Sequence, residues 1–236
     1  ANLVNATSSY AAIAALLPSS STYMNLQVSG GSDQFGAVGF ESIVTNLVGT
    51  ADGDLLIYQG GTKYWGGAGA DTFYADWGTT LGPITWINDP TLTQTVNGVS
   101  VAGLERLLIT TGVGNDQVNN NYAGNGTSDY IDTGAGNDTI NGGLGTDTIF
   151  AGAGNDSVVT NAGSETVDLG DGNDTLTASH GVDSLTAGLG TDTLLVDLDY
   201  SGFGAGNALR YFIGAPSFAN LVNATSSYAA IAALLP

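Results

Sequence analysis

The sequence predicts an all-β protein, a parallel β-roll with 18-residue coils and short helical or irregular capping segments at its ends. From Gly124 to Leu195 the chain divides into eight contiguous nonapeptides. The first half of most copies is rich in glycine, and the second half is strand-like, as in TGAGNDTIN at residues 133–141. The eighth position is aliphatic in every copy and the sixth is always acidic. A fixed period of this kind indicates a repeated structural unit.

Each nonapeptide is expected to form one tight turn and one short strand. Glycine adopts the positive φ that such turns require, and the strand directs its eighth residue inward. Two successive nonapeptides complete one coil, and the coils stack because a single coil cannot bury its apolar face. The predicted inward row consists of Ile131, Ile140, Ile149, Val158, Val167, Leu176, Leu185 and Leu194.

The regular coils occupy only part of the chain. Broken copies of the nonapeptide stand at Gly66–Tyr74 and Thr111–Asn119, and a more degenerate one at Gly49–Ile57. The segments 39–50 and 103–114 each precede a broken copy and are expected to be early coils. The predicted order is an N-terminal cap or linker at 1–38, irregular early coils with an insertion at 39–110, the regular roll at 111–200, an exit or cap segment at 201–218, and a final segment at 219–236.

Seven bulky aromatic residues, including all three tryptophans, lie between Tyr58 and Trp86. They are expected to pack in a widened core or at a contact between repeats, and a sugar-stacking platform is the alternative. The segment Thr79–Gly98, with Pro83 and Pro90, is expected to be a loop or hairpin that leaves the roll.

Residues 219–236 repeat residues 1–18 without a change. The repeat is either an artificial duplication or the start of a second 218-residue unit in a tandem array, and we favour the array. Within 1–18, Ser8 or Ser9 is a candidate N-cap, apolar residues follow at helical spacing, and Pro18 ends the pattern, so a short amphipathic helix is expected to cap the roll.

The composition excludes several classes of function. The 236 residues carry a formal charge of −19, with only 3 basic residues, which opposes binding to nucleic acid and to anionic membrane surfaces. The absence of cysteine excludes disulfides and thiolate metal sites. No apolar run is long enough for a membrane helix, so membrane insertion is not expected. Apolar residues make up 42%, which is enough to build a core.

The acidic sixth residues are expected to form columns of carboxylates along the roll. Stacked coils place them about 4.8 Å apart, so the column repels itself unless a cation neutralises it. Carboxylate and carbonyl oxygens without nitrogen or sulfur ligands select a hard ion, and their flexible coordination favours Ca²⁺ over Mg²⁺. We therefore expect several bound calcium ions. The acidic positions are Asp129, Asp138, Asp147, Asp156, Glu165, Asp174, Asp183 and Asp192.

The nonapeptides resemble the RTX family, whose repeat is G-G-x-G-x-D-x-U-x with U a large apolar residue. The resemblance implies a calcium ion between repeats i and i+2. The first repeat would give the carbonyls of its positions 2 and 4, the second those of its positions 1 and 3, and both would give their aspartate. Carried over, the ligand sets are Gly134, Gly136 and Asp138 with Ala151, Ala153 and Asp156; Gly152, Gly154 and Asp156 with Leu169, Asp171 and Asp174; and Gly170, Gly172 and Asp174 with Ala187, Leu189 and Asp192.

A fourth site is expected where repeat 111 precedes repeat 133 by more than one regular coil, with four extra residues between them. Asn120–Ala123 should then bulge outward, while Gly112, Gly114 and Asp116 still face Asp138. In the other, degraded column Asp129 lies over Asp147, whereas Glu165 and Ser179–His180 depart from the pattern. An early pair, Asp54 with Asp71, has a spacing one residue shorter than a regular coil.

Catalysis is not expected. His180 is the only histidine, and the acids Glu41 and Glu105 have no spacing that defines a glycosidase pair. We expect a calcium-stabilised structural module of a secreted or cell-surface bacterial protein, such as a surface layer, filament or adhesin, that assembles with further copies of itself. The alternatives are a glycan- or surface-binding adhesin domain that uses the aromatic region, and the accessory roll of a secreted hydrolase or epimerase.

Overall fold

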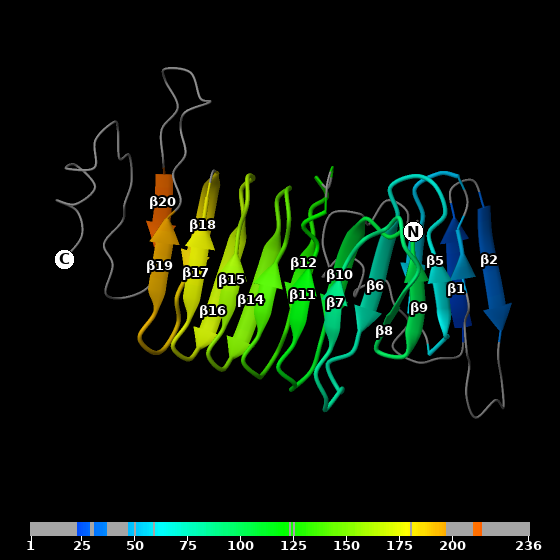
Figure 1. Cartoon of the computed structure of the whole chain (residues 1–236). Coiled ribbons are helices and arrows are strands. Elements are labelled where there is room, and N and C mark those ends of the chain that lie inside the picture. Colours follow the sequence, from blue (N-terminus) through cyan, green and yellow to red (C-terminus); the bar gives the residue numbers. More distant parts are fainter. Residues whose placement is uncertain are drawn as a thin grey trace, which may run out of the picture. The chain divides into compact units, whose positions relative to one another are not determined.

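The computed structural model describes residues 23–28, 31–36, 47–49, 51–58, 60–122, 124, 126–179, 181–196 and 210–213. All regular elements within these ranges are β-strands (Figure 1). The chain forms two compact units, one of residues 1–76 with 88–109 and one of residues 77–87 with 110–236.

The second unit contains the regular roll. One of its sheets has the order β19-β17-β15-β13-β11-β7, and every neighbouring pair is parallel. The strands of this sheet are β7 (Thr85–Ile87), β11 (Gln117–Asn119), β13 (Thr139–Asn141), β15 (Ser157–Val159), β17 (Thr175–Ala178) and β19 (Thr193–Val196). Ile140 pairs with Val158, and Val158 with Leu176. One coil therefore consists of two nonapeptides, as predicted.

A second parallel sheet is built from the alternate nonapeptides. Its strands in this unit are β12 (Tyr130–Asp132), β14 (Thr148–Ala153), β16 (Thr166–Asp171), β18 (Val182–Thr186) and β20 (Arg210–Ile213). Position 8 is buried in the core between the sheets in seven of the eight contiguous repeats, with Ile131, Ile140, Ile149 and Val158 each 0% exposed, whereas Leu194 in β19 is half-buried. The predicted β-roll and its inward aliphatic rows are confirmed over these strands.

Residues 79–87 form an additional nonapeptide of the roll, which differs from the expectation that Thr79–Gly98 is a loop or hairpin that leaves the roll. β7 pairs with β11 so that Trp86 is opposite Val118, the eighth residue of repeat 111. Trp86 is 1% exposed. The segment TTLGPITWI thus occupies the place of a nonapeptide, with tryptophan in the aliphatic position and Ile84 in the acidic one. Its missing aspartate hid it from the sequence pattern.

The longer step between repeats 111 and 133 is accommodated partly as predicted. Val118 pairs with Ile140, so four extra residues are inserted without loss of register. Asn121 is exposed, but Asn120 is fully buried rather than bulging outward. The Asn120 backbone N–H donates to the carbonyl of Asn141, and its Nδ2 donates to Asp129 Oδ2 at 2.7 Å. Asn120 therefore stabilises the turn next to a buried acid.

The first unit contains shorter and less regular coils. β4 (Leu55–Ile57) pairs in parallel with β6 (Thr72–Asp76), and the spacing between paired residues is one residue shorter than a regular coil. The next strand of this type is β10 (Arg106–Thr110). At its start, the N–H groups of Glu105 and Arg106 both donate to the backbone carbonyl of Asp71. A second sheet has the order β3-β5-β9-β8, from β3 (Leu47–Val48), β5 (Lys63–Trp65), β9 (Val99–Ala102) and β8 (Gln94–Val96). β8 and β9 form an antiparallel hairpin whose turn, Asn97-Gly98, has positive φ at both residues.

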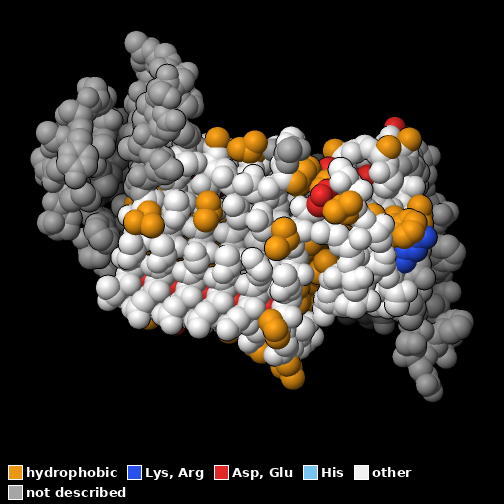
Figure 2. All heavy atoms as spheres, viewed as in Figure 1, with side chains coloured by type: hydrophobic (Ala, Val, Ile, Leu, Met, Phe, Trp, Pro, Cys, Tyr) orange, Lys and Arg blue, Asp and Glu red, His pale blue; other side chains and the backbone are white. Residues whose placement is uncertain are grey.

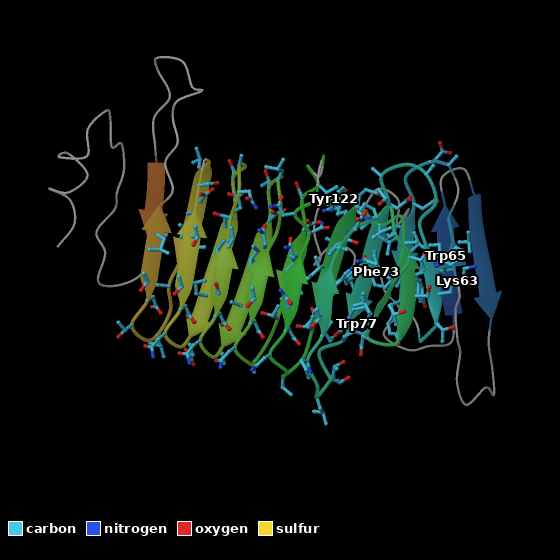
Figure 3. The ribbon with its side chains drawn as sticks, in the orientation of Figure 1. Lys63, Trp65, Phe73, Trp77 and Tyr122 are labelled. Carbon is cyan, nitrogen blue, oxygen red and sulfur yellow. The ribbon has the colours of Figure 1, made fainter. Side chains whose placement is uncertain are left out.

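The aromatic residues are mostly core residues in both units. Tyr64 and Phe73 are 0% exposed in the first unit, and Trp77 packs against Trp86 in the second with ring centroids 6.2 Å apart. Trp65 is the one half-buried tryptophan, and Lys63 Nζ lies 3.6 Å from the centroid of its ring (Figure 3). Widened-core packing thus accounts for most of the cluster, and Trp77 is too buried to stack on a sugar.

The predicted end segments are described only in part. β1 (Tyr23–Val28) and β2 (Gly31–Gly36) form an antiparallel hairpin within the expected N-terminal cap or linker. β20, in the expected exit segment, pairs in parallel with β18. The expected helix in residues 1–18, its copy at 219–236, Glu41 and His180 lie outside the described residues. In the described part, no helix is long and apolar enough to span a membrane.

The stacked turns leave no room for a side chain at their glycines. Gly154 has a φ of 140°, and a Cβ atom there would overlap the carbonyl oxygen of Gly136. We expect Gly154→Ala to cost more than about 2 kcal/mol, because it adds this overlap to the backbone strain of a positive φ. Urea unfolding at saturating calcium measures the cost. Gly126, where a Cβ would meet nothing within 4 Å, is the matched control, and equal stabilities of Gly154→Ala and Gly126→Ala would contradict the prediction.

Candidate metal centre

The sixth residues of alternate repeats form a buried column in the second unit. Asp138 and Asp174 are 1% exposed and Asp156 is 2% exposed. Each backbone N–H donates to the carboxylate of the next coil: Asp138 N to Asp156 Oδ1 and Asp156 N to Asp174 Oδ1, both at 2.8 Å. Figure 2 shows acidic atoms only as small red patches along the roll. The predicted column therefore exists, and its carboxylates lie within the turns.

Only one oxygen of each carboxylate is used in this ladder. The Oδ2 atoms of Asp138, Asp156 and Asp174 are buried and form no hydrogen bond within the described part of the chain. A buried anionic oxygen without a donor is costly, and natural structures pair it or bind a metal there. This donor set of hard, orphaned oxygens fits Ca²⁺.

Burial makes the charged form of these carboxylates unfavourable. It raises the pKa of Asp138 from its ordinary value of 3.8 to about 6, against the opposing effects of the N–H donated by Asp116 and of the nearby Thr133 hydroxyl, which itself donates to Ala151 O. Asp156 and Asp116 raise it further by repulsion. Burial also raises the pKa of Asp156 and that of Asp174, each with a contribution from the next aspartate in the column. At neutral pH the column thus needs a compensating positive charge.

The column has a distinct first member. Asp138 Oδ1 accepts the N–H of Asp116 at 2.7 Å, so the predicted contact across the longer step is confirmed. Asp116 Oδ2 accepts the hydroxyl of Thr111, and Asp116 Oδ1 accepts the N–H of Ile84 at 2.7 Å. Because Ile84 has no carboxylate, the column stops at Asp116. At the other end, Asp174 N donates to Asp192 Oδ1 at 3.0 Å.

The turn carbonyls stack in register with the column. Gly134 O accepts the N–H of Ala153, and Ala153 O accepts the N–H of Gly136. In the same way, Gly170 O accepts the N–H of Leu189, and Leu189 O accepts the N–H of Gly172. Asp171 O accepts the N–H of Gly154. Ala151 O accepts the Thr133 hydroxyl at 2.9 Å. These carbonyls, predicted as calcium ligands, are thus engaged between coils here, and the ligand set stays a prediction.

The turns of Gly112, Gly114 and Ala187 continue the same stack. A Cβ at Gly134 would overlap Gly112 O, and one at Gly136 would overlap Gly114 O. Likewise, a Cβ at Gly152 would overlap Gly134 O. Ala187 directly precedes Gly188 in the sequence. A Cβ at Gly188 would overlap Gly170 O. The glycines therefore allow adjacent turns to approach as closely as the strands do.

A second ladder, which the sequence reasoning did not identify, runs along position 5. The Asn137 side chain accepts the N–H of Asn155 at 2.7 Å, and the Asn155 side chain accepts the N–H of Asn173 at 2.8 Å. At the two ends of the ladder, the Asn115 side chain accepts the N–H of Asn137, and the Asn173 side chain accepts the N–H of Thr191. Here the side chain reaches the following coil, whereas the aspartate reaches the preceding one. The recurrent Asn-Asp pair was the available signal.

The degraded column is also assembled. Asp129 N donates to Asp147 Oδ1 at 2.8 Å, so these two acids lie in adjacent coils as predicted. Glu165 N donates to Asp183 Oδ1 at 3.1 Å. All four acids are at most 3% exposed. The departure of Glu165 from the nonapeptide pattern has therefore not removed it from the column.

A third, shorter column lies in the first unit. Asp54 N donates to Asp71 Oδ1 and Asp71 N donates to Glu105 Oε2, both at 2.7 Å. Gly66 and Asp71 are separated by a glycine-rich turn, whereas Gly103 and Glu105 are separated only by Leu104. Burial raises the pKa of Asp71 to about 6, with repulsion from Glu105 and Asp54. The Asp54–Asp71 contact is thus present, and it extends to Glu105.

In the described residues, no group of three or more histidine, cysteine or acidic side chains converges on a metal position. Calcium would therefore depend on main-chain oxygens in addition to the carboxylates.

Comparison with known families identifies the repeat. A family model described as the RTX calcium-binding nonapeptide repeat (4 copies) matches residues 64–80, 123–158 and 159–194. The matched segments include the columns at Asp138–Asp192 and at Asp129–Asp183, and the turn before Asp71. No curated protein and no solved structure matches the chain.

Proposed function

The chain carries RTX calcium-binding nonapeptide repeats, and from this premise we propose that it is a calcium-stabilised structural module of a secreted or cell-surface protein, used in tandem with further copies of itself. The observation that carries the proposal is the column of buried carboxylates whose Oδ2 atoms form no hydrogen bond in the described residues. Those atoms are the groups that a bound calcium ion would neutralise.

Calcium would hold the roll through the residues predicted above, with the carboxylates of Asp138, Asp156 and Asp174 as shared ligands. The ion supplies positive charge and joins consecutive coils, and the chain supplies the oxygens. At millimolar calcium, a site with a dissociation constant near 10⁻⁴ M adds about 1.4 kcal/mol to stability. Four such sites would add about 6 kcal/mol, which is comparable with the whole stability of a small domain.

Two observations support secretion and tandem assembly. Sites of this affinity are largely empty at the low calcium concentration of the cytosol and fill at millimolar calcium outside the cell. The repeat of residues 1–18 at 219–236 supports an arrangement of successive units. A surface layer, filament or large adhesin uses such arrangements.

Glycan binding, the alternative function, could use fewer aromatic rings than the seven in the sequence, because most of them are buried. Of the three tryptophans only Trp65 is half-buried rather than buried, and Lys63 lies over its ring. A sugar would have to displace this lysine or use the other face. We therefore favour the structural function over glycan recognition, and we propose no catalytic activity.

A calcium titration followed by far-UV circular dichroism tests the proposal. After treatment with EDTA at pH 7, we expect a cooperative gain of β-sheet signal with millimolar Ca²⁺ and no comparable gain with Mg²⁺. The reason is that the columns supply flexible oxygen ligands and lose their mutual repulsion on binding. A chain that is folded in EDTA and indifferent to calcium would contradict the proposal.

A further inference from the structure

The regular roll ends at an uncovered strand. In the described residues, β19 is the last strand of its sheet, beyond β17 (Figure 1). Leu194 stands in the inward aliphatic position of β19 but is half-buried, whereas Leu176 in the same position of β17 is 3% exposed. Asp192 is likewise half-buried, whereas Asp174 one coil earlier is 1% exposed. A strand edge that also leaves core residues exposed favours the addition of a further strand.

The hydrogen-bond pattern of this sheet defines what the added strand must supply. The N–H of the seventh residue in each coil donates to the carbonyl of the sixth residue in the coil before it, as Thr193 N does to Asp174 O. The next coil would in the same way donate to the carbonyl of Asp192. It must also supply an apolar eighth residue to cover Leu194.

The other sheet continues one strand further and fixes the register of that coil. β20 pairs with β18 so that Ile213 lies opposite Leu185, the eighth residue of its repeat. The eighth residues of successive regular repeats are nine residues apart, as at Leu185 and Leu194. Nine residues after Ile213 the sequence has Val222, which is also aliphatic. The strand that follows β20 is therefore expected at residues 220–223, Asn-Leu-Val-Asn.

This tetrapeptide belongs to the duplicated segment. Residues 219–236 repeat residues 1–18, so 220–223 is the copy of 2–5. The tetrapeptide ends before the serines that are candidate N-caps of the expected helix, so a strand there is compatible with a helix after it. Asn220 takes the acidic position of the nonapeptide. The nonapeptide at 79–87, with Ile84 in that position, shows that the roll accepts a residue other than an acid there.

From this register we infer that the edge of β19 is a docking site for residues 220–223, and that it joins one unit of the array to the next. In this arrangement Leu221 N donates to Asp192 O, Val222 covers Leu194, and Asn223 lies beside Leu195, which is 51% exposed. Because 220–223 and 2–5 are identical, the strand that completes one roll is also the first segment of the following unit. The junction between units is thus a continuation of the sheet and not a free linker. The inference rests on the proposed tandem function and names the surface through which the units connect.

Disulfide cross-linking tests the docking site, because the chain has no cysteine of its own. Residues 195 and 223 would be directly paired, and neighbouring strands place Cα atoms about 4.8 Å apart, within the range of a disulfide. Leu195→Cys/Asn223→Cys is expected to form an intramolecular disulfide on mild oxidation of the dilute chain at saturating calcium. The matched control is Leu195→Cys/Asn5→Cys, whose second cysteine lies in the identical tetrapeptide near the start of the sequence. Its intramolecular disulfide should form at least about tenfold more slowly, because only residues 220–223 are held next to β19 by β20.

The rates are read from non-reducing gels, and they separate this docking site from the general proposal. A difference smaller than tenfold, or no intramolecular disulfide in Leu195→Cys/Asn223→Cys, overturns the docking site. If the unaltered chain gains β-sheet signal with calcium, that result leaves the calcium-stabilised function in place. If the unaltered chain gains no such signal, the proposed function itself fails.

Amide hydrogen exchange of the unaltered chain decides the matter if the cysteine variants do not fold at saturating calcium. The N–H of Leu221 is expected to exchange at least about tenfold more slowly than in an unstructured peptide of the same sequence, because it is bonded to Asp192 O. Exchange at the rate of the unstructured peptide overturns the docking site.

Discussion

Acidification is expected to fold the calcium-free chain. The pKa of Asp71 and that of Asp138 are each raised from 3.8 to about 6 in the folded state, chiefly by burial. The folded chain therefore binds more protons than the unfolded chain between these values. The stability from this source is fully present below pH 3.8 and is lost as the pH rises through about 6. Calcium-free protein at pH 7 should be largely unfolded and should gain β-sheet signal as the pH falls to 5.

Circular dichroism in calcium-stripped buffers from pH 7 to pH 5 measures this effect. The titration ends at pH 5 because the isoelectric point is about 4.1, where a chain without net charge precipitates readily. A parallel titration in millimolar calcium is the control and should remain folded throughout. A β-sheet signal that decreases on acidification in the absence of calcium would show that the buried carboxylates do not oppose folding.

The substitution Asp156→Asn is expected to have opposite effects with and without calcium. Asparagine keeps an oxygen for the N–H of Asp138 but removes the charge between Asp138 and Asp174. Without calcium, repulsion along the column falls, and acid-induced folding should occur at a higher pH. With calcium, the two predicted sites that share Asp156 are weakened, at a cost of about 3 kcal/mol at millimolar calcium.

Two titrations of the variant measure these effects: pH in the absence of calcium, and calcium at pH 7. Asp171→Asn is the matched control, because this aspartate is exposed and contributes only its backbone to the predicted ligand set. Its stability should stay within about 0.5 kcal/mol of the unaltered chain in both titrations. If Asp156→Asn stabilises the chain in both titrations, or destabilises it in both, charge is not what couples the column to calcium.

The regular roll could be predicted from the sequence because a single repeat determines both its strands and its turns. The eighth position of each nonapeptide is apolar and the sixth is acidic, so the pairing of Ile140 with Val158 two repeats later follows directly. The columns of carboxylates follow from the same period. Prediction succeeded wherever the local pattern and the stacking of coils required the same residue type.

Prediction failed where a coil keeps its backbone but loses its marker residues. The nonapeptide at 79–87 has Ile84 in place of the acid, and only the pairing of Trp86 with Val118 identifies it. The segment 103–114 was expected to be an early coil, but the place of Glu105 in a carboxylate column was not predicted, because its turn is reduced to Leu104 and its spacing no longer matches a nonapeptide. In both cases contacts with the neighbouring coil preserve the register, and such contacts cannot be read from a single segment.

The two opposed side-chain ladders have a mechanical consequence. At each boundary of the regular roll, an asparagine reaches forward to the next backbone and an aspartate reaches back, as between Asn137 and Asn155 and between Asp138 and Asp156. A force that pulls on the end of the roll must break both of these links, together with the strand pairing, before the outer coil detaches. An inner coil is held at two boundaries and the outermost coil at only one, so the outermost coil detaches first. The roll would therefore extend under tension one coil at a time, with about 60 Å of chain released at each step.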